Sequence, residues 1–312
     1  MHYHDLFAGT FPTGVYPDEW HWRAGISLPS AVREIVNGWK ASPVVARIAL
    51  APSLGRAASE LLGWSSGARV AQDDVLWKPA GAGGVGYHTD AAYISDQFVP
   101  RDDNSVTVWI ALDDADDETG TVEYAVGSHR WHMANGNSNA TESDFHGTAD
   151  VAEPVYAAAT RAGVAPSDVI LRSVSVPRGS AIFHHQDVYH GSRANTHATR
   201  PRRALAIHLI RSDVAFRATP PPDYIYGRYV LREGSTDVSE TFFPVTWLPP
   251  PPDGAPADFL SEPVRALTRR GLSSDAGGEQ KSPLIASWAG AGSDGSGEEA
   301  LEGMLAAWRS ER

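Results

Sequence analysis

The sequence contains no cysteine among its 312 residues. Disulfide bonds, thiolate metal sites and a cysteine nucleophile are therefore excluded. Any bound metal must take its ligands from imidazole, carboxylate or backbone oxygen. Lysine is scarce as well, because the chain holds only three (Lys40, Lys78 and Lys281).

Positive charge is in deficit overall. The chain has 26 Lys and Arg against 38 Asp and Glu, which gives a formal net charge of −12. Binding to nucleic acid is disfavoured, because phosphate contacts need clustered basic side chains. The excess of acid favours either solubility or the attraction of a cationic ligand. We therefore expect a small-molecule partner and no nucleic acid.

Long hydrophobic runs are also missing. No apolar stretch approaches the ~20 residues that a membrane-spanning helix needs. The first residues, MHYHDLFAGTFPTGV, lack the basic start and apolar run of a signal peptide. We therefore expect a cytoplasmic protein without membrane association, as a monomer or homodimer.

The residues that are present predict a single domain over 1–312 that is mainly β with flanking helices. Residues 28–64 form a helical lead-in, with Ser30 capping a first helix, Pro43 and Pro52 starting two more, and Gly63 ending the last. From residue 68 to 212, short strands alternate with turn signals, which is typical of a β-sandwich or barrel.

Within the β region, NSVTVWIALDD is the clearest strand. Val106, Val108 and Ile110 share one face, and Thr107 and Trp109 share the other. We also expect a hairpin in SVSVPRGSAIFHH and a late strand in PRRALAIHLI. A polar loop at 132–150 is expected to act as a lid. Residues 213–312 are expected to hold a Pro-rich aromatic segment, a flexible stretch and a terminal helix.

The stretch GAGGVGYHTD at 81–90 carries two competing motifs. Its glycines match G-x-G-x-x-G, but a dinucleotide site needs a helix directly after them and a βαβ pattern. Neither follows, so we interpret the glycines as a loop between strands. The stretch ends in His88-Thr89-Asp90, a His-x-Asp triplet that suits a 2-His-1-carboxylate iron site.

An iron site of this kind needs a second histidine from a distant strand, and 2-oxoglutarate as cosubstrate needs an arginine for its far carboxylate. His190 lies 102 residues after His88 (190 − 88) and precedes an arginine cluster. Strand alternation places Arg202 on a small, polar face and Arg203 on an apolar face. The alternative is that these arginines form a basic surface turn.

A second triplet, His185-Gln186-Asp187, has no distant histidine followed by an arginine. We expect its His and Asp to line the barrel or to contact the metal ligands from outside. His184 belongs to no such group and is expected to be an ordinary surface or hydrogen-bonded histidine.

Four segments resemble, in family order, the phytanoyl-CoA dioxygenase family of Fe(II)/2-oxoglutarate-dependent oxygenases. The resemblance spans about 35–212. Its segments are ASPVVARIALAPSLGRAASELLG, DDVLWKPAGAGGVGYHTDAAY, SVTVWIALDDADDETGTVEYAVGSHRW and PRGSAIFHHQDVYHGSRANTHATRPRRALAIHL. It implies a double-stranded β-helix core (a cupin-like jelly roll) with N-terminal helices packed outside.

The resemblance also implies site residues and cofactors. Fe(II) would be bound by His88, Asp90 and His190, and O₂ would react there with 2-oxoglutarate. Arg202 and Ser192 would hold the far carboxylate, and Trp109 would either line this pocket or pack in the core. Asp74 stands where a neutral polar residue is usual, so Gln72 is expected to serve instead. Related halogenases lack the carboxylate ligand, so Asp90 favours hydroxylation, desaturation or ring closure.

Acidity, abundant Trp and Tyr, and few lysines for a CoA phosphate favour a hydroxylated or cationic substrate. We expect an oligosaccharide or aminoglycoside in antibiotic biosynthesis, oxidised by hydroxylation or by orthoester-type ring closure. The alternatives are a cupin-like metal-dependent isomerase and a non-catalytic sugar-binding protein. Arg202 distinguishes them, since neither alternative needs a 2-oxoglutarate clamp.

Overall fold

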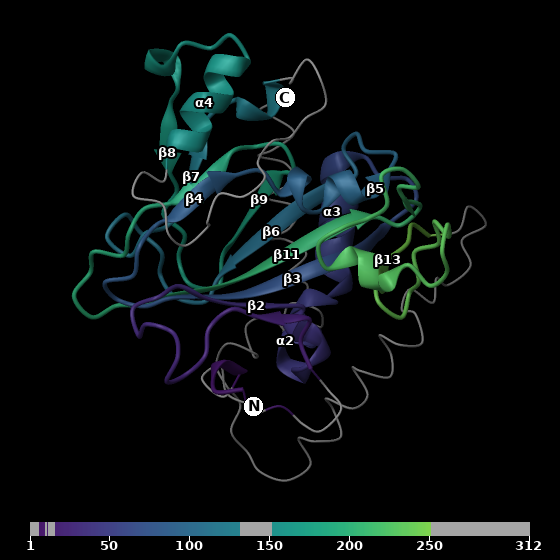
Figure 1. Cartoon of the computed structure of the whole chain (residues 1–312), viewed down its shortest axis with the longest axis horizontal. Coiled ribbons are helices and arrows are strands. Elements are labelled where there is room, and N and C mark those ends of the chain that lie inside the picture. The colour runs from purple at the N-terminus through teal and green to yellow at the C-terminus, as the bar shows by residue number, and fades with distance from the viewer. Residues whose placement is uncertain (1–5, 10, 12–15, 132–151, 251–312) are drawn as a thin grey trace.

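Two antiparallel sheets dominate the computed structural model, which describes residues 6–9, 11, 16–131 and 152–250 (Figure 1). The larger sheet has seven strands, in the order β1-β2-β3-β11-β6-β9, with β13 also paired to β3. The smaller has four, in the order β4-β10-β7-β8. The larger sheet comprises β1 (Glu19–Trp20), β2 (Arg33–Val36), β3 (Ala68–Lys78), β11 (Arg202–Arg211), β6 (Ser105–Ala111), β9 (Ala181–His185) and β13 (Val245–Trp247).

The smaller sheet comprises β4 (Val85–His88), β10 (His190–Ser192), β7 (Val122–Ala125) and β8 (Leu171–Ser173). A separate pair joins β5 (Phe98–Val99) to β12 (Ala215–Phe216). This arrangement confirms the prediction of a mainly β fold with a double-stranded β-helix core.

Two helices follow the predicted starts. α2 (Pro43–Ala49) has Ser42 as N-cap, and the Ser42 hydroxyl accepts a hydrogen bond from the Val45 amide. α3 (Pro52–Leu62) ends at Gly63, whose φ of 70° suits glycine because it has no Cβ. A third, α4 (Glu153–Arg161), lies beside the smaller sheet (Figure 1). Among the described residues, no helix is both long and apolar enough to cross a membrane.

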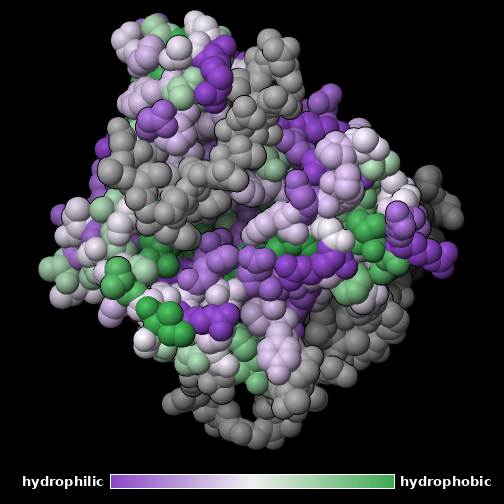
Figure 2. Space-filling view, in the orientation of Figure 1, coloured by the Kyte–Doolittle hydropathy of each residue, from purple (hydrophilic) through white to green (hydrophobic). Residues whose placement is uncertain are grey.

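Short 3₁₀ helices complete the fold: η1 (Gly38–Lys40), η2 (Asp90–Ala92), η3 (Ser95–Gln97), η4 (Ser128–Arg130), η5 (Pro166–Asp168) and η6 (Tyr226–Tyr229). The surface in Figure 2 is mostly hydrophilic, with smaller hydrophobic patches between.

The alternation of β6 divides the core from the cavity. Val106, Val108 and Ile110 pack with β11 and the α2–α3 helices in the largest hydrophobic cluster. Thr107 and Trp109, on the other face, line the cavity described below. Burial of one face therefore fixes which side chains the other face presents.

The predicted helix at 30–36 is wrong. Residues Arg33–Val36 form β2, whose Ile35 pairs with Val75 of β3. Ile35 and Val36 are β-branched and fully buried, which suits a strand paired on both sides, here with β1 and β3.

The predicted hairpin around 177–179 is also wrong. β8 pairs with β7 in the smaller sheet, whereas β9 pairs with β6 in the larger one. The turn at 177–179 therefore carries the chain from one sheet to the other. The lid at 132–150 and the flexible stretch and terminal helix after 250 lie outside the described residues, and the extent of the domain remains a prediction.

Truncating a side chain in the largest hydrophobic cluster should destabilise the protein. Ile207 on β11 is fully buried in the largest hydrophobic cluster. Truncation to alanine should lower the free energy of unfolding by roughly 2–5 kcal/mol, since it removes buried methyl groups and leaves a cavity. Leu231→Ala, at a position that is 59% exposed, should have little effect. Urea denaturation measures both, and equal losses would contradict the assigned core.

Candidate metal centre

The pairing of β4 with β10 brings two distant histidines together. His88 and His190 are direct Cα partners in this antiparallel pair. Partners on one face of such a pair have Cβ atoms ~5 Å apart, so their side chains meet. The two imidazole ring centroids lie 4.3 Å apart.

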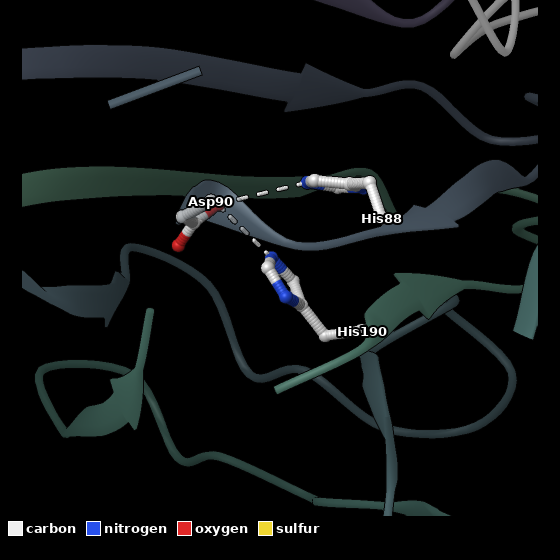
Figure 3. Close-up of side chains that lie close together, drawn as sticks. All are labelled: His88, Asp90 and His190. Atoms are coloured by element: carbon white, nitrogen blue, oxygen red, sulfur yellow. Dashed lines mark ion pairs between the residues drawn. The ribbon is translucent and has the colours of Figure 1, made fainter. Parts of the chain in front are cut away.

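Asp90 completes the group from the turn that follows β4. It begins η2, and Thr89 separates it from His88. One carboxylate oxygen, Oδ1, lies 3.8 Å from His88 Nε2 and 3.5 Å from His190 Nε2 (Figure 3). The three ligand atoms lie within 4.8 Å of one another, so they can hold one metal ion.

The backbone orients both imidazoles. His88 Nδ1 lies 2.9 Å from the Gly86 carbonyl, and His190 Nδ1 lies 3.0 Å from the Val188 carbonyl. A carbonyl only accepts, so each Nδ1 carries the proton and each Nε2 keeps its lone pair. This is the usual outer support of a metal-binding histidine.

Electrostatics favours the metal-binding protonation states. Burial lowers the pKa of His88 and of His190 to about 4, so both rings are neutral at pH 7. Burial alone would raise the pKa of Asp90, but interactions with nearby histidines, His190 first, and a hydrogen bond from His184 hold it well below its usual range. Two neutral imidazoles and a carboxylate form the donor set of a non-haem Fe(II) site, and these residues fit that ion.

These three residues also line a cavity of about 380 Å³. Arg202 and Ser192 both line it, and the Arg202 guanidinium lies 5.3 Å from the Trp109 ring centroid. Arg203 points the other way and pairs with Asp113 at 2.6 Å. The alternation of β11 therefore places Arg202 in the cavity, as the pattern of faces indicates.

Comparison with known proteins gives the family. The phytanoyl-CoA dioxygenase (PhyH) family model matches residues 28–204, which is more than half of the chain. The chain belongs to this family. It is an Fe(II)/2-oxoglutarate-dependent oxygenase.

Two solved structures resemble the oxygenase in fold. One is the non-heme alpha-ketoglutarate-dependent carbocyclase SnoK from nogalamycin biosynthesis, with TM-score 0.51 and 24% identity over 69% of this chain and 75% of that one. The other is the epimerase SnoN in complex with Fe³⁺, alpha-ketoglutarate and nogalamycin RO, with TM-score 0.52 and 20% identity over 73% of this chain and 83% of that one. Among curated proteins, no relative matches the sequence.

A second cation of the oxygenase was not singled out from the sequence. Lys78 is fully buried, and its Nζ donates to Ser192 Oγ at 2.7 Å. It lies opposite Arg202 in the β3–β11 register. Burial, and then the charge of Arg202, lower the pKa of Lys78 well below its usual value. An anion bound beside Arg202 and Ser192 would stabilise the charged forms of both basic groups.

Asp74 and Gln72 form a hydrogen-bonded pair in the cavity wall. Gln72 Nε2 donates to Asp74 Oδ1 at 2.8 Å, and His208 Nε2 lies 2.8 Å from Asp74 Oδ2. The pairing of Asp74 with His208 offsets the repulsion that a lone carboxylate would exert on an anionic cosubstrate.

His184 is a buried, hydrogen-bonded histidine, and its place in the site was not expected. His184 lies in the cavity, with Nε2 at 3.0 Å from Asp90 Oδ2. The position of His184 follows from the register of β9, which pairs it with Thr107 and aims both side chains inward, and the sequence alone does not give that register.

The expectation for His185 and Asp187 is wrong. His185 bonds Asp103 at 2.8 Å, and Asp187 pairs with Arg101. Neither lines the cavity.

Proposed function

We propose that this oxygenase oxidises an unactivated C–H bond of a small molecule at a metal bound by His88, Asp90 and His190. One observation carries the proposal: the three ligand atoms converge in a cavity that Arg202 also lines. When bound, Fe(II) with 2-oxoglutarate and O₂ supplies the oxidising power, and the cosubstrate leaves as succinate and CO₂.

We further propose that Arg202 and Ser192 bind the far carboxylate of 2-oxoglutarate. The planar guanidinium can donate two parallel hydrogen bonds to a carboxylate. Arg202 is only 3% exposed, so water competes little for these bonds. The Trp109 ring beside the guanidinium limits where the cosubstrate chain can lie. Gln72, whose amide bonds Asp74, is proposed to border the same space.

The outer part of the cavity supports a polar substrate. It is lined by Glu34 from β2, by His21, and by the rings of Tyr93 and Tyr224, whose centroids lie 6.1 Å apart. A carboxylate and tyrosine faces suit hydroxyl-rich or amine-bearing molecules better than an acyl-CoA phosphate. We therefore propose an oligosaccharide or aminoglycoside of secondary metabolism as substrate.

The proposed reaction is hydroxylation or oxidative ring closure, of which orthoester formation is one form. Asp90 occupies the carboxylate position of the ligand set, which favours these outcomes over halogenation. The carbocyclase and epimerase named above indicate that this fold accommodates oxidations other than simple hydroxylation. This is consistent with ring closure here.

The proposal is tested by supplying Fe(II), 2-oxoglutarate and a panel of aminoglycosides, neutral oligosaccharides and acyl-CoA esters, and measuring succinate. We expect an aminoglycoside or oligosaccharide to raise succinate release well above the substrate-free rate, with an oxidised product of matching amount. Stimulation by acyl-CoA alone would refute the substrate class. A cupin-like isomerase would convert its substrate without releasing succinate.

A further inference from the structure

The carboxylate of Asp90 has two oxygens with different surroundings. Oδ1 is the atom that lies nearest the Nε2 atoms of His88 and His190. Oδ2 accepts hydrogen bonds from Thr107 Oγ1 and from His184, whose Nε2 lies at 3.0 Å. Asp90 is 5% exposed, so both donors act where water is scarce.

The hydrogen bond between His184 and Asp90 has a defined direction. Asp90 is ionised and can only accept, so His184 Nε2 must carry the proton. Tyr124 lies on the other side of the ring, with its hydroxyl 3.0 Å from His184 Nδ1. With its proton on Nε2, the neutral ring has a lone pair at Nδ1, which accepts from the Tyr124 hydroxyl and so holds this tautomer. β7 and β9, from opposite sheets, thus cooperate to aim one N–H at Oδ2.

The hydrogen bond between Thr107 and Asp90 also has a defined direction. Thr107 gives its only proton to Asp90, so its oxygen accepts from His208 Nδ1 at 2.7 Å. His208 in turn bonds Asp74 through Nε2. Thr107, His208 and Asp74 lie on the neighbouring strands β6, β11 and β3. Three strands of the larger sheet therefore hold this donor in place.

We propose that His184 and Thr107 are positioning residues that reserve Oδ2 of Asp90 and leave Oδ1 alone to bind the metal. The inference rests on the metal site proposed above. An octahedral ion with three protein ligand atoms keeps three positions for the cosubstrate and O₂. A carboxylate free to rotate can bind through both oxygens and fill one of these positions. Together the two donors prevent this.

The test measures water on Mn(II), which reports the open positions without turnover. Mn(II)-loaded protein lacking 2-oxoglutarate should hold three exchangeable waters, counted by water-proton relaxation. The double variant His184→Leu/Thr107→Val should lose about one third of the relaxation enhancement, as Oδ2 takes one of the three positions. Its Mn(II) affinity should fall about 10- to 100-fold, the usual effect of removing outer-shell support.

Matched variants separate positioning from packing. His184→Gln and Thr107→Ser keep a donor and should restore hydration and affinity close to wild type. His185→Leu changes the neighbouring residue, which bonds Asp103 outside the cavity, and should change neither. If the Leu/Val variant does not fold, Tyr124→Phe removes the hydroxyl that orients His184 and should shift hydration in the same direction by less.

Three waters and unchanged affinity in folded Leu/Val protein would overturn the inference. So would a His184→Gln variant as impaired as His184→Leu. If the Leu/Val protein does not fold, unchanged hydration in Tyr124→Phe would overturn the inference instead. Failure of the metal site itself has another signature: wild type and His190→Ala would bind Mn(II) equally.

Discussion

His190→Ala should abolish Fe(II)-dependent succinate formation. The change removes one of the three ligand atoms that lie within 4.8 Å of one another, and alanine offers no replacement. Loss of outer support alone costs metal sites ~10- to 100-fold. Loss of a ligand should therefore lower kcat/KM for 2-oxoglutarate by at least about 100-fold. Succinate release at saturating Fe(II) measures it.

The matched control is His185→Ala. His185 is a neighbour in the chain but bonds Asp103 and lies outside the cavity, so this variant should keep most of its activity. Equal loss in the two variants would point to general damage rather than to a ligand. Retention of activity by His190→Ala would contradict the proposed site.

Arg202→Leu should raise the KM for 2-oxoglutarate by about 100-fold, with a smaller change in kcat. Removing one partner of a buried, hydrogen-bonded charge pair costs roughly 2–5 kcal/mol, and 1.4 kcal/mol corresponds to a factor of ten. The far carboxylate would keep only Ser192, supported by Lys78. Steady-state kinetics and calorimetric titration with 2-oxoglutarate measure the effect.

Arg203→Leu is the control on the same strand. Its guanidinium pairs with Asp113 away from the cavity, so the KM should stay close to wild type. An Arg202 variant with normal affinity for 2-oxoglutarate would refute the clamp, and an Arg203 variant with the larger defect would show that the faces of β11 were misassigned.

Periodicity carried most of what could be predicted of the fold. The alternation in β6 and β11 correctly separated the core face from the cavity face, because one face of each strand must be buried. Proline likewise predicted the starts of α2 and α3, and glycine the end of α3. β2 was missed because a short β-branched segment such as REIV reads equally well as part of a buried helix, and only its pairing with β3 decides.

For the site, spacing and residue type indicated two histidines, His88 and His190, together with Asp90 and Arg202, and all four line the cavity. His184 was missed because a histidine between a phenylalanine and another histidine gives no signal until the register with Thr107 is known. Lys78 was missed for a related reason. Its contact with Ser192 joins strands of different sheets, which no local pattern specifies.

The most direct test of the metal and cosubstrate assignment is an equilibrium titration of Mn(II) into the metal-free protein, followed by 2-oxoglutarate. We predict one Mn(II) per wild-type chain, tight 2-oxoglutarate binding only after the metal is present, and loss of both in His88→Ala/His190→Ala. Metal binding that survives in this double variant, or 2-oxoglutarate binding that is equally tight without metal, would contradict the account.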